Sequence, residues 1–185
     1  MRVDYILLRV TNLSVDHSIL VLYQRRWQKV RSIWAYIHDN YFDDYGYFHL
    51  SGDDNHFIIE NMRNYLWSLN DHDGELPLHI GHRYRKNPHN ICGGGSGYTF
   101  NKATLRIFVE KVLPQCHTSE RTSAEDKFVG LCLGEHGIHC HNTADIRGGQ
   151  RYIGLKPKFA ATFNGDAGVS MKHCTNCGPR DPDIG

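Results

Sequence analysis

Apolar residues recur along much of the chain at helical spacing, interrupted by short runs typical of strands. From residue 24 onward, large apolar side chains follow at intervals of three and four residues and predict a helix with one buried face: Trp27, Val30, Trp34, Ile37 and Tyr41. A turn at residues 43–46 separates this helix from the apolar run 47–50, which predicts a strand. Residues 1–22 carry apolar patches at 5–8 and 19–22 without a sustained pattern, so we expect them to be irregular.

The pattern continues beyond this strand. A second helical stripe is formed by Ile58, Met62, Tyr65, Leu66 and Leu69. Residues 76–80 predict a short strand, and residues 81–88 a basic loop. Asn101 is expected to cap a helix that extends through Val112. A further helix opens at residues 122–126, with Ser123 as its expected N-cap.

Length and charge restrict the class of protein. The chain has 185 residues, enough for one domain with a sizeable core. Its 21 basic and 20 acidic residues give a net charge of +1. This balance gives no indication of a basic surface that would bind nucleic acid or an anionic membrane. No run of about 18 apolar residues is present, and the first ten residues are too short and too charged for a signal peptide.

Two adjacent acids end the strand predicted at residues 47–50. Asp53 and Asp54 would repel each other unless a cation or water separates them, and carboxylate oxygens suit Mg²⁺ or Mn²⁺. Such a metal can also hold a diphosphate. A surface turn is the alternative, because Asp and Asn are common turn formers.

The glycine-rich segment at residues 92–98 is the second candidate for part of a functional site. Its glycines cost backbone entropy on folding, a cost that chains tolerate where a backbone or a ligand must approach closely. The spacing matches neither a Walker nor a Rossmann fingerprint. A flexible surface loop is the alternative interpretation.

Asp126 and the cysteines also leave alternatives open. Asp126 lies three residues after Ser123, as a capping-box acid would, but an acid at a helix N-terminus is also held ionised and suits a general base. Six cysteines do not by themselves define a compartment. Cys174 and Cys177, with His173 nearby, form a weak zinc signal because a structural zinc needs four ligands.

Taken together and in order, these segments resemble the inverting β-1,3-glycosyltransferases with a GT-A fold, the group that holds fringe and the core 1 β-1,3-galactosyltransferase. The resemblance is carried by the helix at 29–41, the acidic segment 52–63, Gly81-His82-Arg83, the glycine-rich segment 93–98 and the segment 123–132. It covers about residues 24–155 and is closest to the core 1 branch. It implies an α/β, GT-A-like (Rossmann-like) glycosyltransferase domain.

The resemblance implies a role for several residues. Asp54 would bind Mn²⁺ (or Mg²⁺) that bridges to the UDP diphosphate, with Asp53 beside it, and Asp126 would be the general base. His173 is the faint counterpart of a late metal-binding histidine. Cys116 and Cys132 match a cysteine pair that family members bridge. The positions that match donor or acceptor contacts are Lys29, Arg83, Gly94, Gly95, Tyr98 and Glu125.

The chain departs from the family at several points. Gly52 replaces the first acid of the metal motif, and residues 152–155 lack the histidine of the corresponding family segment. The membrane anchor and the first nucleotide-binding strands have no counterpart before residue 20, which predicts a domain incomplete in that half and weakly active or inactive alone. An unpaired sheet edge is then expected, with a tendency to form homo-oligomers. We expect one domain over 1–185, with a lead-in at 1–22, a family-like core at 24–155 and an irregular tail at 160–185.

The function implied is transfer of galactose from UDP-galactose, in β-1,3 linkage, to O-linked N-acetylgalactosamine on glycoproteins. Family members work in the Golgi lumen and are membrane-anchored when full-length, although this sequence shows no anchor. One alternative is transfer of another sugar, such as N-acetylglucosamine. Others are a non-catalytic, chaperone-like binding protein and a small zinc module built on Cys174, Cys177 and the histidines.

Overall fold

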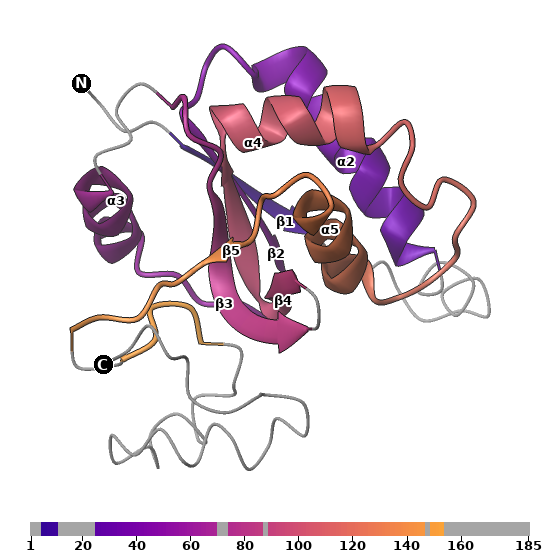
Figure 1. Cartoon of the computed structure of the whole chain (residues 1–185). Coiled ribbons are helices and arrows are strands. Elements are labelled where there is room, and N and C mark those ends of the chain that lie inside the picture. Colours follow the sequence, from indigo (N-terminus) through magenta and orange to yellow (C-terminus); the bar gives the residue numbers. More distant parts are fainter. Residues whose placement is uncertain (1–4, 11–24, 70–73, 87–88, 147–148, 154–185) are drawn as a thin grey trace.

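A mixed β-sheet forms the centre of the computed structural model, which describes residues 5–10, 25–69, 74–86, 89–146 and 149–153 (Figure 1). Its five strands lie in the order β1-β2-β4-β3-β5. β1 pairs with β2 in parallel, β4 is antiparallel to both β2 and β3, and β5 is parallel to β3. The strand bounds are β1 (Tyr5–Val10), β2 (Tyr47–Gly52), β3 (His79–Lys86), β4 (His89–Asn101) and β5 (Cys140–His141).

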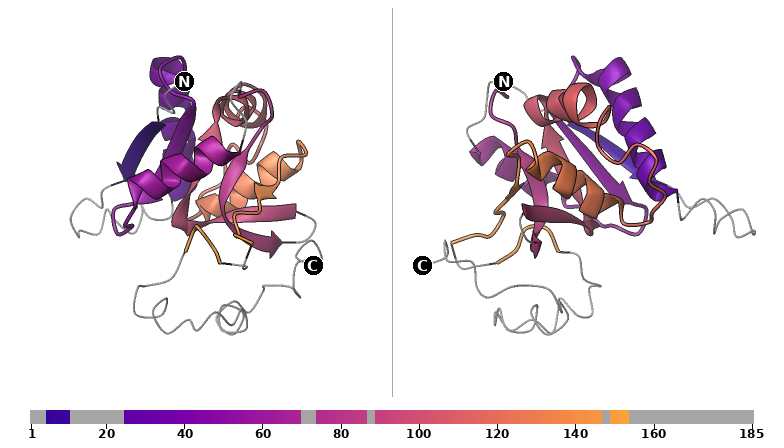
Figure 2. Two further views of the ribbon diagram at one scale, coloured as in Figure 1. Left: turned by 90° about the vertical axis from the view of Figure 1, so that its left-hand side faces the viewer. Right: turned by 45° about the vertical axis from the view of Figure 1, so that its right-hand side comes forward.

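Helices cover both faces of this sheet. One face carries α2 (Arg26–Tyr41), α4 (Lys102–Ile107) with the π-helical turn η1 (Phe108–Val112), and α5 (Glu125–Gly134); the other carries α3 (Ile59–Ser68), as Figures 1 and 2 show. The α/β class expected from the sequence is therefore confirmed. None of the described helices is long and apolar enough to cross a membrane.

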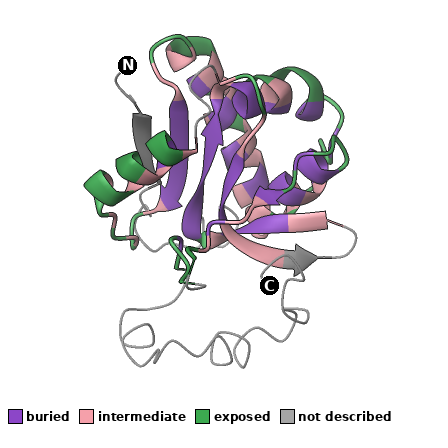
Figure 3. Ribbon diagram, turned by 60° about the vertical axis from the view of Figure 1, so that its left-hand side comes forward, coloured by how far each residue is buried: buried purple, intermediate pink, exposed green. Residues whose placement is uncertain are grey.

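The helical stripe expected from residue 24 onward forms the larger part of the core. Trp27, Val30, Trp34 and Ile37 of α2 are each at most 3% exposed. Trp34 stacks on Phe100 of β4 with ring centroids 4.4 Å apart. Burial of such aromatic side chains is among the largest single contributions to folding. Figure 3 shows the buried residues gathered in the sheet and its neighbouring helices.

The stripe assigned to α3 is buried less than the sequence suggests. Within the helix only Leu66 is buried, and Ile58, just before it, remains 58% exposed. Leu66 packs in a smaller cluster with Tyr47, Ile80 and Tyr152, on the sheet face opposite α2. The residues of α3 other than Leu66 are thus exposed or half-buried.

The expectation of irregular structure at the start of the chain is wrong for residues 5–10. These residues form β1, and every position from Tyr5 to Val10 is in register with β2, from Tyr47 to Gly52. β1 therefore pairs with β2 and is itself the terminal strand of the described sheet. The apolar patch at residues 19–22 lies outside the described residues.

One segment expected to be a loop, and another for which a flexible loop was the alternative, both lie in strands. The basic segment 81–88 belongs mostly to β3, which runs from His79 to Lys86, and the glycine-rich segment 92–98 lies within β4. Neighbouring strands supply the hydrogen bonds that the local sequence does not reveal. The cap at Asn101 is confirmed, because its side-chain oxygen accepts a bond from Thr104 N at 3.0 Å.

Two disulfides link the described cysteines. The pairing of Cys116 with Cys132 is confirmed, with Cα atoms 6.0 Å apart. Cys92 pairs with Cys140, at a Cα separation of 5.1 Å, and joins β4 to β5. This second pair was not predicted, since six cysteines allow many pairings. Cys174 and Cys177, like the tail 160–185 as a whole, lie outside the described residues.

Candidate functional site

A large bulge in β4 organises the site. Gly81 and His82 are consecutive in β3, yet they pair with Tyr98 and Gly93 of β4. Residues 94–97 therefore leave the ladder and bulge beside the end of β2, whose last pair with β4 is Leu50 with Tyr98. Gly97 has φ +70°, a conformation that favours glycine. This bulge is the reason the segment is rich in glycine.

The acidic pair lies at the end of β2 and is tied to the bulge. Asp53 and Asp54 follow the strand directly and are both exposed. The Asn55 amide, oriented to satisfy both neighbours, donates to Gly95 O at 2.9 Å and accepts from Gly52 N at 3.2 Å. A Cβ atom on Gly52 would lie 2.6 Å from Asp54 Oδ1, so the missing side chain at residue 52 leaves room for this carboxylate.

The donor set of this turn suits a metal shared with a ligand. Among the described residues, the only three candidate ligand atoms within 4.8 Å of one another belong to Cys116, His117 and Cys132, and those cysteines are disulfide-bonded. His173 lies outside the described residues. Mg²⁺-like ions are commonly held by one or two carboxylates together with substrate phosphates. Asp53 and Asp54 fit that arrangement.

Asp126 contacts the other side of the same bulge. Its Oδ2 accepts a hydrogen bond from Gly94 N at 2.7 Å, and its Oδ1 accepts one from Lys127 N at 2.7 Å. The expected cap at Ser123 is wrong, because α5 has Ala124 at its N-cap position without a side-chain cap. Asp126 thus binds β4 rather than completing a capping box. Each carboxylate oxygen keeps lone-pair capacity for a further donor.

Glu125 forms an acidic pair with Asp126. Its side chain is 14% exposed, and its Oε2 lies 3.8 Å from Arg26 Nη1. Burial, with the Asp126 carboxylate as a second cause, raises the pKa of Glu125 to about 7. A Cβ on Gly94 would lie 3.0 Å from Glu125 Oε1 and 3.3 Å from Asp126 Oδ2, so both carboxylates lie against this glycine. Glu125 is therefore only partly ionised near neutral pH.

The other residues implied by the resemblance are scattered. Lys29 is exposed on α2, and Arg83 is half-buried on β3, opposite Cys92. Tyr98 is 1% exposed, and its hydroxyl accepts a bond from Trp34 Nε1 at 3.4 Å. Its side chain therefore belongs to the core rather than to the site surface. The structure links the turn of Asp53 and Asp54 to Gly95 through Asn55, and places Glu125 and Asp126 against the adjacent Gly94.

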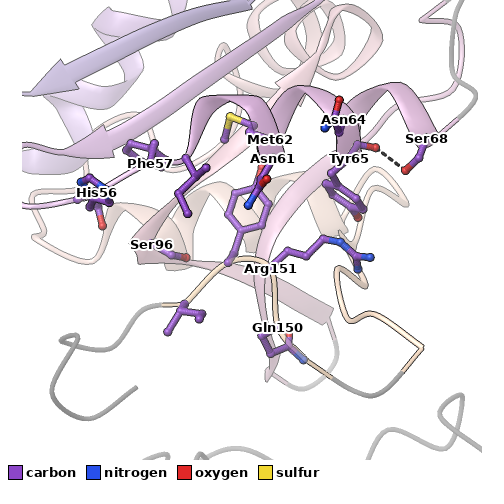
Figure 4. Close-up of a pocket in the computed structure, with 14 residues that line it drawn as sticks. His56, Phe57, Asn61, Met62, Asn64, Tyr65, Ser68, Ser96, Gln150 and Arg151 are labelled. Atoms are coloured by element: carbon purple, nitrogen blue, oxygen red, sulfur yellow. Dashed lines mark hydrogen bonds between the residues drawn. The ribbon is translucent and has the colours of Figure 1, made fainter. Parts of the chain in front are cut away.

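A cavity of about 670 Å³ adjoins the bulge on the α3 side of the sheet. It lies between α3 and residues 150–153 (Figure 4). Its lining also includes Ser96 of the bulge and Asn55 of the acidic turn. No local sequence pattern predicts this cavity, because its walls come from segments about 90 residues apart.

No known protein-family profile matches the chain. Over 113 residues, covering 55% of the chain, it is 30% identical to chondroitin sulfate synthase 3 of Mus musculus, and equally to that of Homo sapiens. The chain spans 12% of the length of each of these relatives. This similarity supports a relationship to glycosyltransferases in general. It does not single out the fringe and core 1 group.

Proposed function

We propose that this chain forms the transfer site of an inverting, metal-dependent glycosyltransferase with a UDP-sugar donor. The observation that supports it best is the shared bulge of β4: Gly94 holds Asp126, while the adjacent Gly95 accepts from Asn55 of the acidic turn. A candidate base and a candidate diphosphate-metal turn are thereby fixed to neighbouring residues. General similarity to a glycosyltransferase agrees with this reading.

In the proposed reaction, Asp126 accepts the proton of the acceptor sugar 3-hydroxyl. The hydroxyl oxygen forms its bond to the donor anomeric carbon from the face opposite the diphosphate. The bond from that carbon to the phosphate oxygen breaks, and UDP leaves with the electron pair. A positioned base typically contributes about 10²–10⁴ in rate. Mn²⁺ or Mg²⁺ held by Asp54, with Asp53 beside it, would stabilise the charge on the leaving diphosphate.

The substrates proposed from the resemblance are UDP-galactose and O-linked N-acetylgalactosamine on glycoproteins, in β-1,3 linkage. A second candidate, favoured by the similarity to chondroitin sulfate synthase 3, is synthesis of a chondroitin-type glycan. Either reaction would occur in the Golgi lumen, an oxidising compartment in which the two disulfides would persist. A non-catalytic, chaperone-like protein with this fold would bind a glycoprotein or nucleotide without transfer.

A transfer assay separates these proposals. The chain is incubated with Mn²⁺, a panel of UDP-sugars and either an O-linked N-acetylgalactosamine peptide or chondroitin oligosaccharides, and Asp126→Asn is run in parallel. Mn²⁺-dependent transfer or donor hydrolysis that is lost in the variant supports the enzyme. Mn²⁺-dependent UDP binding without turnover of any donor would favour the binding protein. The acceptor that is extended identifies the substrate.

A further inference from the structure

The cavity beside α3 has a consistent chemical character. Its lining residues among those described include no Asp or Glu, and their only full cation is Arg151. Its volume of about 670 Å³ lies in the usual range for ligand sites, roughly 300–1,000 Å³. Carboxamides both donate and accept hydrogen bonds, as sugar hydroxyls do, and four contribute to the walls: Asn55, Asn61, Asn64 and Gln150.

Arg151 is held in place at the edge of this cavity. Its Nη1 donates to Thr143 O at 2.8 Å, and its guanidinium lies over the Tyr65 ring, 4.8 Å from the centroid. Figure 4 shows its side chain extending toward Tyr65 of α3. A guanidinium has five N–H donors, and these contacts occupy few of them. Arginine binds carboxylates and other oxyanions through paired donors.

The segment that carries Arg151 is anchored to the sheet by the next residue. The Tyr152 hydroxyl is bonded to Thr99 Oγ1 at 2.7 Å, and Tyr152 O lies 2.7 Å from His82 Nδ1. Tyr152 is 6% exposed. A wall fixed in this way loses little conformational entropy when a ligand binds.

We propose that this cavity is a subsite for a negatively charged sugar residue of a glycan, with Arg151 binding its carboxylate or sulfate. The identification of the ligand as a saccharide rests on the proposed transfer function. The cavity meets the transfer site at Asn55, whose amide also holds the acidic turn to Gly95. The cavity and the acidic turn of the proposed transfer site are therefore adjacent, and one glycan could contact both.

Binding of defined oligosaccharides tests the proposal without any turnover. The probes are a hexasaccharide of alternating uronate and N-acetylhexosamine, the same chain with its carboxylates reduced to alcohols, and the reduced chain carrying sulfate esters. By calorimetry at low salt, at least one charged form should bind about tenfold or more tighter than the reduced chain, since hydrogen bonds to charged groups are the stronger ones. The two charged probes distinguish carboxylate from sulfate.

Three variants test whether the preference for charged over reduced oligosaccharides arises in the cavity. Arg151→Gln and Asn61→Asp should each remove most of this preference, the second by placing a like charge in the cavity while leaving the Arg151 contacts intact. An acid at Asn61, in the first turn of α3, favours the helix, so that variant should fold. Arg106→Gln, an exposed arginine of α4 outside the cavity, is the control and should change nothing.

Equal binding of charged and reduced chains would overturn the proposal, as would a preference that survives both cavity variants. If acetate or inorganic sulfate alone bound as tightly as the charged oligosaccharide, the cavity would be a simple anion site, and the proposal would also be overturned. The result of this binding test can be distinguished from the result of the transfer assay. Selective binding by a chain that transfers no sugar would refute only the transfer reaction, and transfer without selective binding would refute only the subsite.

Discussion

Gly94 N donates a hydrogen bond of 2.7 Å to Asp126 Oδ2, joining the bulge of β4 to the first turn of α5. The donor is a backbone group, so its position depends on the path of the bulge rather than on any side chain. The two residues are 32 positions apart. The orientation of the candidate base is therefore a property of the folded sheet.

Asp126→Asn should reduce transfer by about 10² or more while UDP and Mn²⁺ binding persist. The single oxygen of Asn can accept from Gly94 or Lys127 but not from both, so we also expect a stability loss of about 1 kcal/mol. Initial rates and thermal unfolding measure the two effects. The control is Glu120→Gln, which removes the charge of an exposed acid six positions before Asp126 and should change neither. Turnover at the wild-type rate would show that Asp126 is only structural.

Asp54→Asn should weaken Mn²⁺ binding strongly, because a neutral amide is a poor substitute for a carboxylate ligand. Asp53→Asn should cost less. Gly52→Ala should also weaken binding, because its Cβ would lie 2.6 Å from Asp54 Oδ1 and force the carboxylate to move. Titration of activity or of paramagnetic relaxation with Mn²⁺ measures all three. If Asp54→Asn shows the Mn²⁺ dependence of the wild type, Asp54 is not a metal ligand.

Gly97→Ala should destabilise the chain by about 2–5 kcal/mol, from left-handed backbone strain together with overpacking. Its Cβ would lie 2.5 Å from His49 Nε2 and 2.7 Å from Leu50 O. Gly137→Ala is the matched control, since Gly137 also has positive φ but nothing within 4 Å, and should cost only about 1–2 kcal/mol. Urea unfolding measures both. Equal losses would mean that the bulge is not tightly packed at Gly97.

Glu125 should make stability depend on pH. Its pKa rises from 4.5 to about 7 on folding, so its protonated form contributes stability below pH 4.5 that is lost as pH rises through 7. Burial lowers the pKa of His49 and of His79 from 6.5 to about 3, which has the opposite effect between those values. The difference in unfolding free energy between wild type and Glu125→Gln isolates the first contribution. The stability of wild type relative to Glu125→Gln should fall from pH 4 to pH 8, whereas parallel curves would contradict the assignment.

Removal of Cys92–Cys140 should cost more than removal of Cys116–Cys132. The first bond joins residues 48 positions apart and the second residues 16 apart, so the chain-entropy estimate is about 4 and about 3 kcal/mol respectively. Paired Cys→Ala variants, compared by thermal unfolding, measure these values. The reverse order would indicate that losses of native packing outweigh loop closure.

Several features of this protein follow from short stretches of sequence. The stripe from Trp27 to Ile37 forms α2, the run at residues 47–50 forms β2 with the acids at its end, and Asn101 caps the next helix. Each depends on neighbours within a few residues, because periodicity, capping and strand ends are local effects. The bridge between Cys116 and Cys132 was inferred from family resemblance, which itself depends on these local segments.

Only the tertiary structure decided the rest. Residues 81–86 are mostly polar and look like a loop, but β4 supplies the strand partners that make them part of β3. Asp126 has the sequence position of a capping acid, yet Gly94 binds its carboxylate. The cavity needs α3 and Arg151 to be brought together from distant parts of the chain. Such contacts depend on how strands pair and pack, and local sequence carries no record of which distant segment will become the neighbour.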